Sequence, residues 1–330
     1  MAKQGYLLIN LGTPAAPTTK AVKSYLKTFL MDGRVIALPH LIRFILVYGI
    51  IAPFRSHKTA HAYQAIWTKE GSPLRIHTQE LTQKLEQKHG SKYKIRFAMR
   101  YSEPTIAEAL NELSDCENIG IVPLYPQYAS ATNGSSIMAI FDYFKNKEII
   151  PNLSIIRDFY EHPAYMQALT ESIRPYLKPN SHLLMSYHGL PENQLQKIGC
   201  NPVCTIPCPS KITPGKACYR QQCFLTSKAL ANNLGLTEDQ YTISFQSRLG
   251  KTPWIKPYTD EVLQELAAQG IKNLCVVCPA FVADCLETLE EIEIQAKEQW
   301  QALGGHDFQY IPCLNAQDHW VTALAQILDL

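Results

Sequence analysis

The sequence predicts an α/β fold with two domains, each built on a parallel sheet. Short apolar runs alternate with amphipathic segments along the whole chain, which is the pattern of βαβ units. A length of 330 residues suits about two domains of ~150 residues each. The halves also resemble each other, since Tyr6–Leu8 precedes Gly12-Thr13-Pro14 and His182–Leu184 precedes Gly189-Leu190-Pro191. We therefore expect domains at 1–150 and 151–330.

Eight runs are expected strands, because each is short, apolar and bounded by turn-forming residues. In chain order they are Tyr6–Asn10, Ile95–Met99, Ile119–Leu124, Leu153–Ile156, Leu183–Tyr187, Thr242–Phe245, Leu274–Val277 and Phe308–Ile311. Five segments between them are amphipathic, as expected of surface helices. They are Thr105–Leu113, Ala164–Leu177, Thr226–Leu234, Asp260–Ala268 and Glu287–Leu303.

An apolar stretch from Ile36 to Phe54 belongs to the first domain. Pro39 and Arg43 interrupt it, and the continuous piece that begins at Phe44 is shorter than the ~20 residues that a membrane-spanning helix needs. Two interpretations stay open. The stretch is either a buried helix or an exposed apolar lip that contacts lipid or a greasy ligand.

Composition excludes several classes of protein. The charged residues nearly balance, with 31 Lys plus Arg against 29 Asp plus Glu, so no basic excess indicates a nucleic-acid partner. No glycine-rich phosphate loop is present, which gives nucleotide chemistry little support. The N-terminus passes directly into a strand-like run without a cleavage pattern, and we therefore expect a cytoplasmic protein.

Cysteines cluster in the second domain, at 199–223. Five of the ten cysteines follow the spacing C-x3-C-x3-C-x9-C-x4-C, and they are Cys200, Cys204, Cys208, Cys218 and Cys223. Clustered thiols in a cytosolic chain bind metal or perform redox chemistry more often than they form disulfides. Proline-stiffened thiolates suit an iron–sulfur cluster or a structural zinc ion, and free or disulfide-bonded thiols are a third alternative. The spacing alone does not choose among them.

Polar residues follow several expected strands, at the sheet edge where parallel α/β folds bind ligands. His188 ends one strand, and histidine can exchange a proton near neutral pH. Glu287 and Glu291 share a helix face, and a row of carboxylates can pass on cations or protons. Arg100 could clamp a carboxylate, and Trp254 could contact a flat ligand. Each residue also has a structural interpretation: a core histidine, a solvated acidic helix, a surface ion pair or a core tryptophan.

Ordered motifs across nearly the whole chain resemble those of ferrochelatases, the terminal enzymes of haem synthesis. The matching segments are Leu8–Pro14, Gly71–Leu74, Arg100-Tyr101, Tyr125–Tyr128, Thr132–Ser136, Ser186–Pro191, Phe245–Ser247, Pro253-Trp254 and Asp284–Glu291. The resemblance implies two flavodoxin-like, Rossmann-type domains of the chelatase kind, with the active site in the cleft between them. It also implies a lyase that inserts Fe²⁺ into protoporphyrin IX, with release of two protons.

The resemblance assigns the catalytic residues and the ligands of the iron substrate. His188 matches the active-site histidine, and Glu287 matches the glutamate that faces it, so both are expected to meet Fe²⁺. Asp284 supports Glu287, and Glu291 continues an acidic path. This chain departs from the best-studied members by carrying Gln295 where they have a further acid.

The resemblance also assigns the substrate-binding residues. Leu11, Tyr63 and Trp254 are expected to grip the porphyrin ring. Arg55 and Arg100 are expected to face the propionates, and Tyr101 lies beside Arg100 in the same set.

The cysteine segment resembles the internal insertion of some bacterial members, which implies a 2Fe–2S cluster. Cys223 matches a position that also carries cysteine in cluster-free relatives. Cys200, Cys204, Cys208 and Cys218 are therefore the expected ligands, with Cys223 in reserve.

Other functions compete with this one. Coproporphyrin or a corrin precursor could replace protoporphyrin as substrate, although an apolar lip suits the less charged ring. A haem- or iron-binding redox protein and a zinc-dependent structural module are alternatives from other classes. The expected partners are protoporphyrin IX, Fe²⁺ and the haem product, with peripheral contact at the inner face of the membrane.

Overall fold

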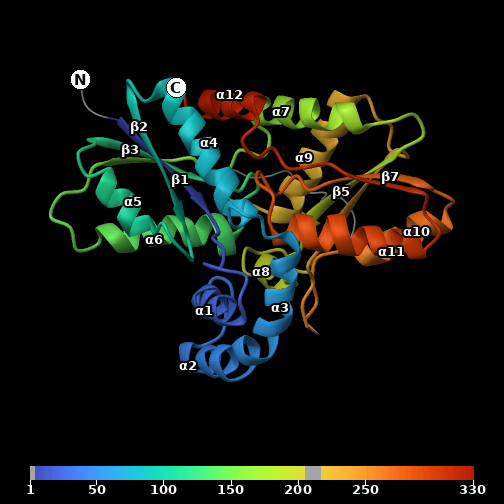
Figure 1. Cartoon of the computed structure of the whole chain (residues 1–330), viewed down its shortest axis with the longest axis horizontal. Coiled ribbons are helices and arrows are strands. Elements are labelled where there is room, and N and C mark those ends of the chain that lie inside the picture. Colours follow the sequence, from blue (N-terminus) through green and yellow to red (C-terminus); the bar gives the residue numbers. More distant parts are fainter. Residues whose placement is uncertain (1–3, 205–216, 251) are drawn as a thin grey trace. The chain divides into compact units, whose positions relative to one another are not determined.

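Two four-stranded parallel sheets organise the computed structural model, within the residues that it describes: 4–204, 217–250 and 252–330 (Figure 1). The first sheet contains β1 (Gln4–Asn10), β2 (Tyr93–Met99), β3 (Asn118–Pro123) and β4 (Asn152–Ile155). The second contains β5 (His182–His188), β6 (Tyr241–Gln246), β7 (Asn273–Val277) and β8 (Asp307–Tyr310). Each predicted strand is observed, and the prediction of an α/β fold with parallel sheets is confirmed.

Both sheets share one topology. Their strand orders are β2-β1-β3-β4 and β6-β5-β7-β8, so corresponding strands occupy corresponding positions. Leu8 pairs with Phe97 on one side and Val122 on the other, and Leu184 likewise pairs with Thr242 and Val276. In both sheets the chain reverses its direction of winding beside the first strand. Ligands of open α/β sheets bind outside the carboxyl ends of the strands at such a reversal.

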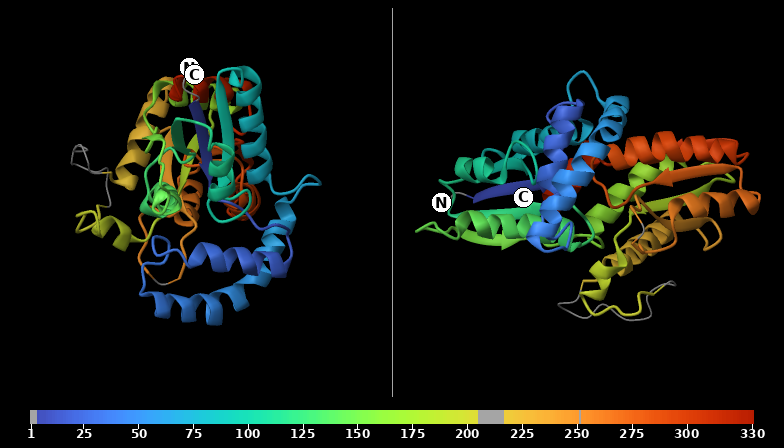
Figure 2. Two further views of the ribbon diagram at one scale, coloured as in Figure 1. Left: turned by 90° about the vertical axis from the view of Figure 1, so that its left-hand side faces the viewer. Right: turned by 90° about the horizontal axis from the view of Figure 1, so that it is seen from below.

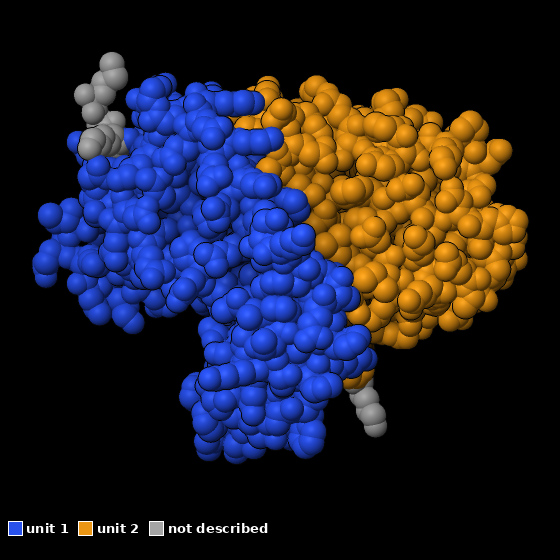
Figure 3. Space-filling model, viewed as in Figure 1, with its two compact units in different colours: residues 1–125, 129–158, 328–330 blue, residues 126–128, 159–327 orange. Residues whose placement is uncertain are grey.

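The described chain forms two compact units (Figure 3). Unit 1 comprises residues 1–125, 129–158 and 328–330, and unit 2 comprises 126–128 and 159–327. Unit 1 continues past residue 150 because β4 pairs in parallel with β3 and completes the first sheet.

Helices cover both faces of the first sheet. On one face, Leu7 and Ile9 of β1 pack against α5 (Ile106–Glu112) and α6 (Ser135–Phe144). Side chains alternate along a strand, so Leu8 and Asn10 point to the opposite face. There the Asn10 amide donates to Thr78 of α4 (Pro73–His89) at 3.2 Å. The buried polar pair fixes α4 on the sheet beside the end of β1.

A group of helices follows β1 in unit 1. It comprises α1 (Thr19–Leu30), α2 (His40–Phe44), the π-helix η1 (Ile45–Ile51) and α3 (Ala52–Ile66), and Figure 2 shows them gathered away from the sheet. Within this group, the apolar side chains of the stretch that ends at Phe54 are largely exposed, with Leu41 at 69% and Phe54 at 78%. The buried-helix interpretation of this stretch is therefore wrong, since Val47 is buried but most of its apolar neighbours are not.

Unit 2 repeats the layered plan. Leu184 of β5 packs with α10 (Thr259–Ala268), the long π-helix η4 (Leu286–Ala296) and α11 (Lys297–Ala302). On the other face, the Tyr187 hydroxyl lies 2.7 Å from Ser227 of α9 (Tyr219–Leu234). The remaining helices of this unit are α7 (Pro163–Ile173), η3 (Arg174–Tyr176), α8 (Glu192–Gln196) and α12 (Asp318–Ile327).

The predicted helices are present, with two differences. The segment expected at Thr226–Leu234 begins earlier, at Tyr219. The segment expected at Glu287–Leu303 is a π-helix for most of its length and becomes an α-helix only at Lys297. None of the helices within the described residues is both long enough and apolar enough to cross a bilayer.

Candidate active site

His188 is the last residue of β5, at the reversal point of the second sheet. Its Nδ1 lies 2.6 Å from the carbonyl oxygen of Gly189. A carbonyl oxygen can only accept a hydrogen bond, so Nδ1 is the donor, and in the neutral form of the ring the lone pair lies on Nε2. That nitrogen can take up a proton or bind a metal ion.

Aromatic residues surround the His188 ring. The ring centroids of Trp254 and Phe281 lie 6.3 and 6.4 Å from it. Gly189 permits this close packing, because a Cβ there would lie 3.2 Å from the indole and 2.9 Å from the Gln246 carbonyl oxygen. The buried Tyr219 hydroxyl donates to the His188 carbonyl at 2.8 Å. The backbone and flanks of the histidine are thus fixed, and the ring is only partly buried.

Asp284 is a buried anchor at the start of η4. One carboxylate oxygen accepts from the Thr288 hydroxyl at 3.1 Å, the Cys313 amide at 3.2 Å and the Tyr310 hydroxyl. The other accepts from the Asn315 amide at 2.7 Å. A carboxylate that accepts several hydrogen bonds is held in one orientation. Asp284 therefore fixes the first turn of the helix that carries Glu287.

The helix η4 presents Glu287 and Glu291 along its length. π-Helices are rare and concentrate at functional sites. Glu287 is partly exposed, and its backbone carbonyl accepts from the Gln246 side chain at 2.6 Å. Burial, followed by the negative charge of Glu287, raises the pKa of Glu291 from 4.5 to about 7. A carboxyl group with that pKa can exchange protons near neutral pH.

Two neighbouring residues of the β6 end hold Glu291. The Ser247 hydroxyl donates to its Oε2, and Gln246 Nε2 lies 3.3 Å from the same oxygen. A cavity of about 290 Å³ adjoins this carboxylate, and Asp260, Gln295 and Gln299 are among its lining residues. Gln295, the residue that departs from the family pattern, donates instead to Glu290 at 2.7 Å.

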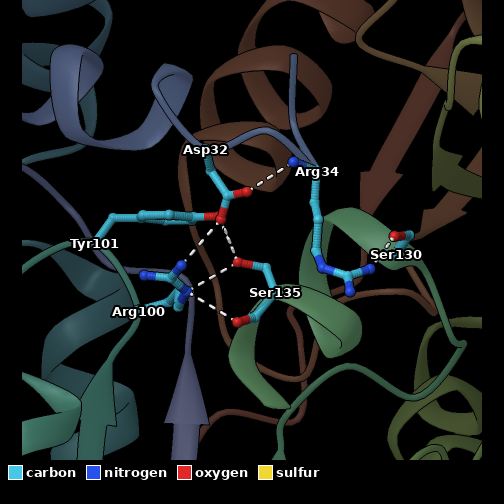
Figure 4. A network of polar contacts seen from close by, with 6 residues as sticks. All are labelled: Asp32, Arg34, Arg100, Tyr101, Ser130 and Ser135. Atoms are coloured by element: carbon cyan, nitrogen blue, oxygen red, sulfur yellow. Dashed lines mark hydrogen bonds and ion pairs between the residues drawn. The ribbon is translucent and has the colours of Figure 1, made fainter. Parts of the chain in front are cut away.

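In unit 1, the Arg100 side chain is engaged within the protein (Figure 4). Its Nη2 forms an ion pair with Asp32 at 3.0 Å, and its Nε donates to the Ser135 hydroxyl at 2.8 Å. The Tyr101 hydroxyl also donates to Asp32, at 2.9 Å. Burial raises the pKa of Tyr101, and the Asp32 charge adds to this. Both predicted substrate-binding residues thus hold the Asp32 carboxylate, which sequence reasoning missed.

Asp32 organises the loop after α1. Burial opposes ionisation, but hydrogen bonds from Ser135, the Arg34 amide and Tyr101, with the Arg100 charge, lower the pKa of its carboxyl group. The Arg34 side chain donates to Ser130 at 2.8 Å, at the first turn of the π-helix η2 (Ser130–Gly134). Sequence reasoning missed Arg34 as well, since its only local sign is an arginine two residues after an aspartate.

The other predicted residues of unit 1 occupy different environments. Leu11 is partly exposed directly after β1, and its carbonyl accepts from the Tyr101 amide at 3.0 Å. Tyr63 is buried on α3, with its ring centroid 6.1 Å from that of Trp67. Arg55 is exposed on the same helix, next to Phe54.

Four of the five clustered cysteines lie within the described residues. Cys200, Cys204 and Cys218 are partly exposed, Cys223 is buried, and Cys208 lies outside the described residues. Among the residues that the structure describes, no three His, Cys, Asp or Glu side chains are arranged to hold a metal ion. The buried Arg220 places its guanidinium 3.7 Å from the Cys204 sulfur.

Comparisons with known proteins agree on one family. The profile of the ferrochelatase family matches residues 3–329. A ferrochelatase of Legionella pneumophila (strain Lens) is 54% identical over 99% of both chains. A ferrochelatase of Coxiella burnetii (strain CbuG_Q212) is 43% identical over 98% of this chain and 93% of its own.

Among solved structures, SirB from Bacillus subtilis with Fe³⁺ matches with a TM-score of 0.55. The alignment covers 99% of this chain and 94% of SirB at 13% identity. A multidomain protein of Deinococcus radiodurans, described as structurally similar to chelatases, matches with a TM-score of 0.52 over 99% of this chain and 55% of its own. At these identities the two matches concern the fold alone.

Proposed function

The chain belongs to the ferrochelatase family, and from that premise we propose how its own residues perform the reaction. The enzyme is a metal chelatase that inserts Fe²⁺ into protoporphyrin, the terminal step of haem biosynthesis. Insertion requires removal of two pyrrole protons and loss of water from the iron. The chain must therefore supply proton acceptors and ligands that later release the metal.

We propose that His188 provides the first of these groups. The observation that carries this proposal is the bond from Nδ1 to Gly189, which leaves the Nε2 lone pair available. Nε2 can accept a pyrrole proton or transfer Fe²⁺ to the ring. Trp254 and Phe281 beside the histidine offer apolar surface to a flat macrocycle, while Leu11 and Tyr63 are proposed ring contacts from unit 1.

Glu287 is the proposed second group, and Glu291 receives protons from it. Asp284 holds the start of η4 through its hydrogen bonds, which orients the turn that carries Glu287. The pKa of Glu291, about 7, suits a group that takes up a proton and passes it on at neutral pH. Glu287 is also the proposed carboxylate ligand of the iron substrate, opposite in charge to Fe²⁺.

The propionates of the porphyrin are the proposed partners of the exposed Arg55. Arg100 and Tyr101 contribute through Asp32, because their polar groups already hold that carboxylate. We propose that they fix the loop of residues 32–34 beside the substrate. Haem is the product of the reaction.

Turnover is the direct test. Purified enzyme is incubated anaerobically with Fe²⁺ and either protoporphyrin IX or coproporphyrin, and haem formation is followed by absorbance. We expect faster turnover with protoporphyrin, and loss of at least 100-fold in His188→Ala with unchanged circular dichroism. Near-normal turnover of this variant would remove His188 from the mechanism, and inactivity of the wild type on both rings would overturn the function.

We propose that segment 199–223 binds a 2Fe–2S cluster through Cys200, Cys204, Cys208 and Cys218. The number of thiols and the Arg220 charge beside Cys204 support an anionic sulfur site. Burial raises the pKa of the Cys223 thiol and disfavours the thiolate that binds metal, which supports its place in reserve. No catalytic step passes through this cluster.

Protein purified anaerobically distinguishes the alternatives. Two iron and two sulfide per chain, with visible absorbance that Cys204→Ser abolishes, would support the cluster. Stoichiometric zinc and no colour would replace it with a zinc site.

The exposed apolar helices of unit 1 support peripheral membrane contact. Leu41, Ile45 and Phe54 are exposed. The Lys27 Nζ lies 4.5 Å from the ring centroid of Tyr48. Apolar side chains next to cations suit an anionic lipid surface. We propose a cytoplasmic enzyme that docks at the inner face of the membrane through this surface.

A further inference from the structure

We propose that Ser247 is a positioning residue of the reaction, because its hydroxyl holds the Glu291 carboxylate in place beside Glu287. This inference rests on the proposed function, in which Glu291 receives protons from Glu287. It assigns Ser247 no contact with the porphyrin or with iron.

The backbone at Ser247 has the conformation that this contact requires. Successive side chains of a strand point to opposite faces, so Gln246 and the next residue would ordinarily diverge. Ser247 instead has φ = +68°, in the left-handed region that few non-glycine residues adopt. Both side chains therefore reach the same oxygen of Glu291. A strained conformation that serves one contact is typical of functional sites.

Gln246 completes the support on the other side. Its Oε1 accepts from the buried Ser186 hydroxyl at 2.8 Å, which fixes the amide. Its Nε2 then reaches the Glu287 carbonyl and Glu291. The Gly189 amide donates to the Gln246 carbonyl at 2.9 Å, so one residue links the loop of His188 to the helix of Glu287. Ser247 extends this link by one further hydrogen bond.

Glu291 needs such support because its side chain has space to adopt another position. The cavity of about 290 Å³ adjoins the side chain, and water there could solvate a carboxylate that rotates away. Repulsion from Glu287 and Glu290 on the same helix favours that rotation. Two donors on one oxygen oppose it, since hydrogen bonds to a charged group are among the stronger ones.

A matched pair of variants separates the hydroxyl from the backbone. Ser247→Ala removes the hydroxyl and keeps a Cβ in the left-handed region, whereas Ser247→Gly removes the hydroxyl and also relieves the strain. We expect both variants to lower kcat about tenfold with little change in KM for protoporphyrin. Tenfold corresponds to 1.36 kcal/mol. Ser247→Gly should nevertheless be at least as stable as the wild type in a thermal melt.

A double-mutant cycle with Glu291→Gln completes the test. If Ser247 acts through Glu291, Ser247→Gly has no additional effect on kcat in the Glu291→Gln enzyme. Full additivity, wild-type kcat in Ser247→Gly, or a rise in KM alone would each overturn the inference. In each of these cases the wild type would still insert iron, so the proposed function would stand. An inactive wild type would overturn the proposed function itself.

Discussion

Glu291 makes the free energy of unfolding depend on pH, and the substitution Glu291→Gln should remove this dependence. Its pKa is about 7 in the folded chain, against an ordinary value of 4.5. Between these pH values the folded chain holds a proton that the unfolded chain has lost. Stability from this group is therefore fully present below pH 4.5 and is lost as pH rises through 7. The difference of about 2.5 pH units corresponds to about 3 kcal/mol.

Glu291→Gln replaces the acid by a neutral group of similar shape, which keeps an oxygen for the Ser247 hydroxyl. We expect the variant to match the wild type in stability near pH 4.5. By pH 8 the variant should exceed it by about 3 kcal/mol. With a urea m-value of about 2 kcal/mol/M, that difference moves the unfolding midpoint by ~1.5 M.

The assay must report on unit 2 alone, because two compact units need not unfold together. Three of the four tryptophans, Trp254, Trp300 and Trp320, belong to unit 2. A Trp67→Phe background therefore confines the fluorescence signal to that unit. Glu298→Gln, on the exposed surface of α11, controls for the loss of one negative charge. A difference between wild type and Glu291→Gln that stays constant from pH 4.5 to 8 would refute the reasoning.

Three further predictions concern other sites. Asp32→Asn should destabilise unit 1 by about 2 kcal/mol, because Arg100 then keeps its charge without a carboxylate; an unchanged melting temperature would contradict this. Asp284→Asn places an NH₂ group where some of the present hydrogen-bond donors point. We therefore expect the free energy of unfolding to fall by about 2 kcal/mol and kcat to fall as well, measured by thermal melts and turnover. Phe54→Ser should lower the fraction of protein that sediments with anionic vesicles but leave turnover in detergent unchanged. A variant that sediments as much as the wild type would argue against the proposed docking surface.

The sheets could be predicted from the sequence because their signal is local. Each buried parallel strand is a short apolar run, and the repeated order of runs and helices carries the topology with it. The strand-end position of His188 followed from the same pattern. Which ring nitrogen of His188 carries the proton could not be predicted, because this depends on the distance from Nδ1 to the Gly189 carbonyl oxygen.

Contacts between distant residues and rare backbone conformations escaped prediction. Asp32 pairs with Arg100 across 68 residues, and an isolated Asp-Gly-Arg after a helix carries no sign of that partner. The π-helical form of η4 also escaped, because a row of glutamates four residues apart suits an α-helix equally well. The left-handed backbone of Ser247 escaped prediction as well, because serine seldom adopts this conformation and its residue type does not indicate it.

In the proposed mechanism, the acidic row works without the acid that is expected at residue 295. In this chain the outer residue is Gln295, which donates to Glu290 and cannot carry a proton at neutral pH. Glu291 is thereby the last titratable side chain on the line that runs from Glu287 through Glu291 to Gln295. The last group on such a path must bind a proton at neutral pH, and it must also face water in order to release that proton. Under this proposal, the raised pKa of Glu291 meets the first requirement and the adjoining cavity meets the second, while Ser247 keeps the carboxylate between Glu287 and that cavity.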